Sequence, residues 1–284
     1  MSIAIAKKQM VCYNKISINP KESMVIMMYA NYHTHTTRCN HARGSEREYI
    51  ETAIERGVKV LGFSDHVPYP FPNGHESGFR VPRALLEDYV VTIENLKKEY
   101  ADQIEIHLGF EAEYYPKYHA LLLEYLQPYP YEYLIMGQHF IANEIDEPIY
   151  CGGKVGADVP WRYARQVIEG LRTGDFTYFA HPDLPSNTER GQDYPDAMEY
   201  VCREALALNI PLELNFLGLH DRRVYPCHDF WEIAGRVGNK VIFGCDAHDP
   251  WAVADPATIE LAEAWVGQHG LQVIDRVTLH RPNM

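Results

Sequence analysis

The sequence has no long hydrophobic run, no closely paired cysteines and no cluster of basic residues. No stretch of its 284 residues approaches the roughly 18 consecutive apolar residues that a membrane-spanning helix requires. The N-terminal region also lacks the pattern of a secretory signal, because Lys7 and Lys8 interrupt the only early apolar run. We therefore expect no membrane association.

Cysteines are few and scattered. The six are Cys12, Cys39, Cys151, Cys202, Cys227 and Cys245. None belongs to a Cys-x-x-Cys pair, so their spacing fits neither a disulfide framework nor a zinc ribbon. We predict reduced thiols and a cytoplasmic location.

Basic residues are outnumbered by acidic ones. The chain has 26 Lys and Arg against 39 Asp and Glu, which gives a formal net charge of −13. A protein that binds DNA or RNA needs a concentrated basic surface, and the sequence contains no clustered Lys/Arg stripe. We therefore expect a small-molecule substrate rather than a nucleic-acid polymer, with bound cations offsetting part of the negative charge.

Short β-rich runs alternate with amphipathic helical stretches along the whole chain. Seven such units follow one another without a long linker, which favours one closed or nearly closed parallel barrel over two domains. We place this single domain at residues 28–284 and interpret residues 1–27 as an N-terminal extension without a role in the fold. A doubly wound open sheet is the alternative, but it would gather ligands at one switch point.

The predicted elements are short and evenly spaced. The seven strands are 28–33, 59–64, 104–111, 133–137, 177–180, 212–215 and 240–244. The seven helices are 45–56, 82–100, 117–127, 159–172, 194–208, 228–236 and 256–268. A run at 273–277 is too weak to count as an eighth strand. The first helix opens with a capping-box pattern, because Ser45 is followed three residues later by Glu48.

Metal-capable side chains close these strands one after another. They are His33, His35, His41, His66, Glu111, His139, His181, Asp246 and His248, with Asp65 beside them. Residues i and i+2 of a strand face the same side, so His33 can converge with His35. The carboxyl ends of barrel strands are where barrel enzymes hold their chemistry. Only a closed ring would bring residues so distant in sequence to one point.

Packing alone does not explain this pattern. An isolated His-x-His pair would more often be two surface histidines, but here seven of the fourteen histidines stand at or just past strand ends. Imidazole and carboxylate ligands suit zinc, manganese or iron. Nine ligands are too many for one ion, and with Glu111 as a bridge they could serve three.

Six short blocks carry a family resemblance. They are residues 31–41 (NYHTHTTRCNH), 62–66 (GFSDH), 109–113 (GFEAE), 137–139 (GQH), 180–183 (AHPD) and 244–248 (GCDAH). Through these blocks the chain resembles the PHP (polymerase and histidinol phosphatase) superfamily. Residues 212–226, which contain Leu-Glu-Leu-Asn and Arg-Val-Tyr-Pro, are similar to its histidinol-phosphate phosphatase branch.

The resemblance implies an α/β fold, a distorted seven-stranded (β/α)7 barrel of the TIM-like kind, with three divalent transition-metal ions. By motif position, the ligands of the first ion would be His33, His35, Glu111 and Asp246. Those of the second would be Glu111, His139 and His181, and those of the third His41, His66 and His248. One departure is the pair His220-Asp221, which stands where the branch often has an arginine.

These features predict a metal-dependent phosphomonoesterase, with L-histidinol phosphate of histidine biosynthesis as the best single substrate. Water activated between two ions would attack phosphorus, and Asp246 would handle its proton. Asp65 would either protonate the leaving group or orient a ligand histidine. Arg190, and Arg222 or Arg223, would bind the phosphate, because arginine suits bidentate contacts with phosphate.

Two alternatives stay open. The nearest is another PHP activity, on a nucleotide or a small phosphodiester. The other is a metal-binding module without turnover. Assays on a panel of phosphate monoesters and diesters with manganese-loaded protein would separate them.

Overall fold

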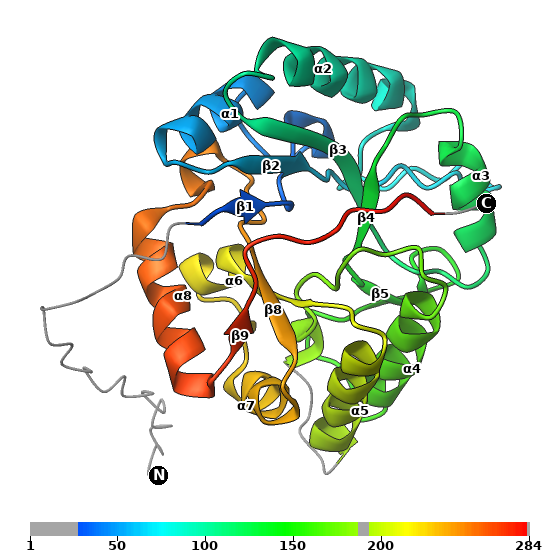
Figure 1. The fold of residues 1–284 in the computed structure, drawn as a ribbon. Helices are drawn as coiled ribbons and strands as arrows, with labels where there is room; N and C mark the ends of the chain where they lie inside the picture. Colours follow the sequence, from blue (N-terminus) through cyan, green and yellow to red (C-terminus); the bar gives the residue numbers. More distant parts are fainter. Residues whose placement is uncertain (1–27, 187–192, 283–284) are drawn as a thin grey trace, which may run out of the picture.

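A computed structural model describes residues 28–186 and 193–282, in which curled parallel strands are covered by helices on the outside (Figure 1). The predicted extension at residues 1–27 lies outside the described residues, and so does Arg190. No described helix is long and apolar enough to cross a membrane.

The first parallel sheet has four strands, in the order β1 (Ala30–Asn31), β2 (Val60–Phe63), β3 (Glu105–Ala112) and β4 (Tyr133–Met136). Every residue of β2 and β4 is buried. Such continuous burial is expected for parallel strands that are covered on both faces, and it explains why these segments read as unbroken apolar runs.

A second sheet has three parallel strands, β7 (Leu212–Asn215), β8 (Lys240–Gly244) and β9 (Gln272–Val273). Isolated parallel bridges link the two sheets on either side. Phe179 bridges Met136 of β4 and Leu212 of β7. Thr34, beyond β1, bridges Ala247, beyond β8. The predicted α/β class with a curled parallel sheet is therefore confirmed.

The predicted fifth strand, residues 177–180, does not form a regular strand, so the count of seven strands is not confirmed. Its backbone still bonds to both neighbours, because Thr177 N–H donates to Leu134 and Phe179 N–H donates to Pro211. The stretch ends at His181, whose φ of +29° departs from the extended conformation. Strand β9 overlaps the weak run at 273–277.

Helices form the outer layer (Figure 1). The described α-helices are α1 (Glu46–Glu55), α2 (Leu86–Glu99), α3 (His119–Leu126), α4 (Val159–Leu171), α5 (Asp193–Ala207), α6 (Phe216–Asp221), α7 (His228–Val237) and α8 (Pro256–His269). All seven predicted helices are present with slightly different ends. Helix α6 is an addition; it directly follows β7, where the Asn215 side chain accepts from Gly218 N–H.

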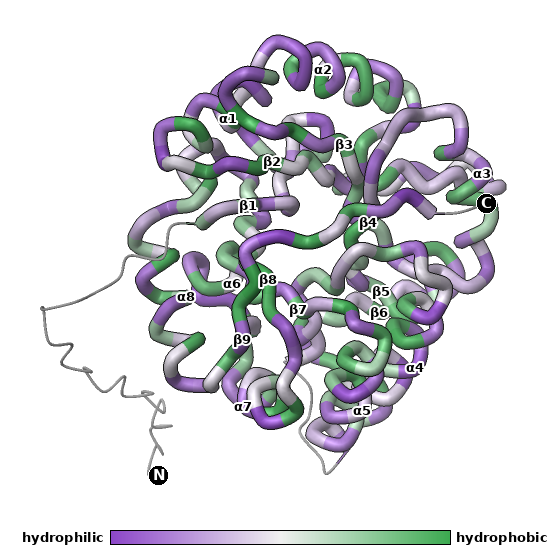
Figure 2. The backbone as a smooth tube through the Cα atoms, in the orientation of Figure 1, coloured by the Kyte–Doolittle hydropathy of each residue, from purple (hydrophilic) through white to green (hydrophobic). Residues whose placement is uncertain are grey.

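Two helices show how local sequence sets these elements. The predicted capping box of α1 is confirmed, because Ser45 accepts from Glu48 N–H and the Glu48 carboxylate accepts from Ser45 N–H. In α2, the buried residues recur at helical spacing: Leu86, Tyr89, Val90, Ile93 and Leu96. Figure 2 shows the matching alternation of hydrophobic and hydrophilic residues along this helix.

A β-hairpin between β4 and α4 was not predicted. Its strands are β5 (Phe140–Asn143) and β6 (Glu147–Tyr150), which pair antiparallel. The turn depends on Asn143, whose side-chain oxygen accepts from the N–H groups of Ile145 and Asp146. This Asx-type turn was the available sequence signal. The hairpin brings Phe140 and Tyr150 to the rim of the site described below.

Candidate metal centre

Glu111 lies at the centre of the predicted cluster, near the C-terminal end of β3. Its carboxylate is buried, and a Cβ at Gly137 would lie 1.8 Å from Oε1, so only glycine leaves room for it. His181 Nε2 lies 2.8 Å from Oε1, and His66 Nδ1 lies 2.9 Å from Oε2. Three more imidazoles bring Nε2 to 3.6 Å from these oxygens: His33, His35 and His139.

Buried carboxylates hold three of these imidazoles from behind. Measured from Nδ1, the pairs are His33 with Glu213 (2.9 Å), His35 with Asp65 (3.3 Å) and His139 with Glu113 (2.8 Å). An ionised carboxylate only accepts hydrogen bonds, so Nδ1 carries the hydrogen of the neutral ring. Nε2 is then a bare lone pair facing Glu111, which is the arrangement that metal-ligating histidines adopt.

Backbone carbonyls fix the tautomers of His41 and His248 in the same way. Nδ1 of His41 lies 2.7 Å from Cys39 O, and Nδ1 of His248 lies 2.9 Å from Asp246 O. Because carbonyl oxygens only accept, both Nε2 atoms of the neutral rings are lone pairs. These two atoms lie 2.9 Å apart. Two lone pairs at that distance repel unless a proton or a metal ion lies with them.

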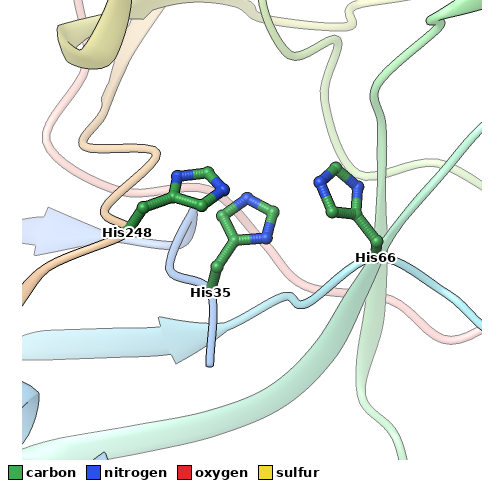
Figure 3. A group of neighbouring side chains, drawn as sticks. All are labelled: His35, His66 and His248. Atoms are coloured by element: carbon green, nitrogen blue, oxygen red, sulfur yellow. The ribbon is translucent and has the colours of Figure 1, made fainter. Parts of the chain in front are cut away.

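His35, His66 and His248 form a compact group in this cluster (Figure 3). The ring of His35 lies 4.0 Å from that of His248 and 4.5 Å from that of His66, centroid to centroid. One ligand-capable atom of each residue lies within 4.8 Å of the others. His33, His35 and Glu111 meet the same condition, so His35 lies between two candidate ion positions.

The charge balance of the cluster calls for cations. Burial alone would lower the pKa of His33, but Glu213, Asp246 and Glu111 raise it to about 10. Burial would raise the pKa of Asp246, but His33 and His35 hold it well below its ordinary value. The carboxylates therefore stay ionised, and in the metal-free protein protonated imidazoles supply the positive charge that bound cations would replace.

Several buried atoms of the cluster have no hydrogen-bond partner among the described residues: His33 Nε2, His35 Nε2, His66 Nδ1, His181 Nδ1 and Glu111 Oε2. Even the 3.0 Å approach of His35 Nε2 to Asp246 Oδ1 leaves Nε2 without an acceptable hydrogen bond. Each unpaired buried polar atom costs about 1–3 kcal/mol. Divalent transition-metal ions would satisfy these atoms, because imidazole nitrogen and carboxylate oxygen are among their usual ligands. The residues present therefore fit the metals that the resemblance implies.

Asp65 lies behind the cluster rather than in front of it. It is fully buried, and Oδ1 also accepts from His66 N–H at 2.8 Å. Oδ2 accepts from Thr36 N–H at 3.0 Å and from the Thr36 hydroxyl. Burial would raise the pKa of Asp65, but His35 and Thr36 lower it, so the group stays ionised. This placement favours orienting His35 over donating a proton to a leaving group.

A cavity of about 740 Å³ opens in front of the cluster. Glu111, Asp246 and several of the histidines form its floor. Arg223 lines the wall, where its guanidinium donates to the Tyr225 hydroxyl (3.3 Å) and to Asp221 (3.2 Å). Arg222 is exposed and is not part of the cavity lining.

The structure thus brings all nine predicted ligands to one place, and it adds residues that the sequence analysis did not single out. Glu113 and Glu213 orient His139 and His33. The available signal was a glutamate inside a buried apolar strand and another two residues after Glu111. Cys39 is buried near His41 and His248. Arg43 also lines the cavity.

Comparison with known proteins agrees with this geometry. The sequence model of the PHP domain matches residues 31–216, which span β1 to the start of α6 and most of the cluster. The chain belongs to the PHP domain family.

Relatives and solved structures of this family resemble the chain over most of its length. A probable histidinol-phosphatase of Deinococcus radiodurans is 29% identical over 233 residues, which cover 78% of this chain and 86% of that protein. The crystal structure of histidinol phosphate phosphatase from Lactococcus lactis, complexed with zinc, L-histidinol and phosphate, superposes with a TM-score of 0.68. That comparison covers 88% of this chain and 99% of the other at 18% identity, so it shows a shared fold.

Proposed function

We propose that this PHP-family protein is a metal-dependent phosphomonoesterase that hydrolyses L-histidinol phosphate to L-histidinol and phosphate, a reaction of histidine biosynthesis. The observation that carries the proposal is the ring of imidazole lone pairs around buried Glu111, at the floor of an open cavity. The names of similar proteins, histidinol-phosphatases from several bacteria, supply the substrate. A cavity of about 740 Å³ is large enough for such a molecule.

The proposal includes three divalent ions, of zinc, manganese or iron. His33, His35, Glu111 and Asp246 would hold the first; Glu111, His139 and His181 the second; and His41, His66 and His248 the third. Glu111 contacts histidines of all three sets, which supports its role as a bridge. The bridges at Phe179 and Thr34 support counting the barrel as seven-stranded, with the ligands at one end of the ring.

The protein's own residues would direct the reaction. Bound ions would supply Lewis acidity and a hydrolytic nucleophile at neutral pH. Asp246, which is held by Asn215 Nδ2 at 3.1 Å, would accept the proton of the attacking water. Arg223 would stabilise charge on the phosphoryl oxygens. Arg190 is proposed for the same role, and Arg222 is the weaker candidate because it lies off the cavity.

A substrate panel tests this function. Protein loaded with manganese or zinc should hydrolyse L-histidinol phosphate with a kcat/KM well above that for a simple alkyl phosphate, a mononucleotide or a phosphodiester. Equal turnover of all monoesters would leave the phosphatase activity standing but remove the substrate assignment. No turnover of any phosphate ester by protein that contains its metals would overturn the proposal.

A further inference from the structure

Tyr225 lies at the cavity wall beside the metal cluster, but it has no role in the proposed ligand sets or phosphate contacts. The residue is 5% exposed and contributes to the cavity lining. Its ring centroid lies 5.7 Å from that of His181. A tyrosine in this position brings a phenol to the same end of the barrel as the proposed ions.

The Tyr225 hydroxyl accepts one hydrogen bond but donates none to the described residues. Its oxygen accepts from Nη1 of Arg223 at 3.3 Å. A phenol also carries one O–H donor, and no acceptor for that hydrogen is found among the described residues. The donor therefore remains available beside the Arg223 guanidinium, at the wall of the cavity.

The surrounding backbone fixes the ring in place. A Cβ at Gly218 of α6 would lie 2.4 Å from Tyr225 O and 2.6 Å from its ring, so the glycine is needed for this packing. Two residues further on, Cys227 N–H donates to Asp183 Oδ2 at 2.6 Å. The hydroxyl is thus held before any ligand binds, which is what a preorganised donor requires.

We propose that the Tyr225 hydroxyl donates a hydrogen bond to a non-bridging oxygen of the substrate phosphoryl group, and acts with Arg223 as one phosphate-binding unit. This inference rests on the proposed phosphatase function. Arg223 supplies charge, and Tyr225 supplies a short O–H···O⁻ bond that strengthens as charge moves onto the phosphoryl oxygens. Because the contact is to a non-bridging oxygen, it should matter equally for every leaving group.

The test compares Tyr225→Phe with Tyr163→Phe in the metal-loaded protein. Tyr163 is the matched control, because it is a buried tyrosine whose hydroxyl donates to Pro182 O at 3.1 Å and which is outside the cavity lining. Tyr225→Phe should lower kcat/KM by about 10²-fold, by the same factor for L-histidinol phosphate and for p-nitrophenyl phosphate. Metal content should match wild type, and Tyr163→Phe should keep kcat/KM.

Two other results would overturn the inference. A loss confined to L-histidinol phosphate, whose alkoxide leaving group needs a proton, would mean that Tyr225 serves the leaving group instead. Unchanged kinetics would make Tyr225 only a wall residue. Calorimetric binding of inorganic phosphate separates this inference from the proposed function. If wild type binds phosphate and Tyr225→Phe binds it at least about tenfold more weakly, Tyr225 has the inferred role even if L-histidinol phosphate is not the substrate. Equal phosphate binding by both proteins contradicts it.

Discussion

Strand β3 carries a histidine–glutamate cluster at each end, and the two clusters balance their charges differently. At the N-terminal end, His107 uses both ring nitrogens: Nδ1 lies 2.6 Å from Glu132 and Nε2 lies 2.8 Å from Glu105. Glu132 also pairs with Lys97, and Glu105 lies 3.2 Å from Arg276. Every charged group named here therefore has a partner in the chain itself.

The C-terminal end of the same strand lacks this internal balance. The carboxylates of Glu111 and Asp246 face imidazole nitrogens that are lone pairs in the neutral rings, and several of those atoms have no hydrogen bond. A cation bound from outside the chain would take the place of the protons that these imidazoles otherwise carry. A cluster of histidines and acids is thus a candidate metal site when its acceptors outnumber its donors, and a structural ion-pair network when they match.

The largest effect is expected from a substitution in the C-terminal cluster. Glu111→Gln should abolish activity and release bound metal, because a neutral amide is a poor bridging ligand between two cations. Metal content by elemental analysis and turnover of L-histidinol phosphate are the measurements. Wild-type protein loaded under the same conditions should contain close to three ions per chain.

The matched control is Glu132→Gln at the other end of β3, which should keep both metal and activity. Loss of metal in both variants would show that the two ends do not differ as described. One ion per chain in the wild type would contradict the three-ion proposal and leave a smaller site.

The next largest effect is expected on catalysis, with metal binding unchanged. Arg223→Ala should lower kcat/KM by about 10²–10³-fold, or roughly 2–4 kcal/mol, because it removes one charge-assisted contact to a phosphoryl oxygen. Metal content should stay at the wild-type level. Arg236→Ala, which removes an exposed arginine paired with Glu199 on the outer layer, should change neither quantity. Unchanged kinetics in Arg223→Ala would mean that the ions alone hold the phosphate.

A smaller effect concerns the carboxylates behind the ligands. Glu213→Gln should weaken metal binding by about 10–100-fold, because the amide fixes the tautomer and orientation of His33 less firmly. Asp175→Asn is the control: Asp175 is a buried acid 2.7 Å from His119 Nε2, outside the metal cluster. Competition with a chelator measures the affinity. Equal weakening by both changes would indicate a general loss of stability.

The sequence allowed the clustering of the nine candidate ligands to be predicted, because each one ends or follows an apolar run and strand ends converge in a curled parallel sheet. It could not show which polar residues face inward behind those ligands. Glu213 reads as an ordinary residue of a short strand, and only the three-dimensional register places it against His33. Asp65 could be assigned two roles from sequence, and its contacts with His35 and Thr36 favour one of them.

The fold, too, could be predicted where the signal is local in the sequence, and not where it depends on contacts between distant segments. The α1 capping box and the helical spacing of α2 are local patterns, so they could be predicted. Residues 177–180 have strand-like composition, but their regularity depends on how β4 and β7 meet on either side. The β5–β6 hairpin was not predicted, because its strands are only four residues long and its turn signal is a single asparagine.

The smallest effect lies at the N-terminal end of β3 and concerns stability rather than catalysis. Burial would raise the pKa of Glu132, but His107 and Lys97 lower it to about 2 in the folded protein. A carboxyl whose folded-state pKa is depressed stabilises the fold above its ordinary pKa, and this contribution is lost as the pH falls toward the folded value. Glu132→Gln should therefore lower Tm slightly at pH 7, and its difference from wild type should shrink between about pH 4.5 and pH 2. Thermal melts across this range in metal-free protein, where the C-terminal cluster contributes no bound ions, give the measurement. A difference that grows as the pH falls would contradict the pairing of Glu132 with His107 and Lys97.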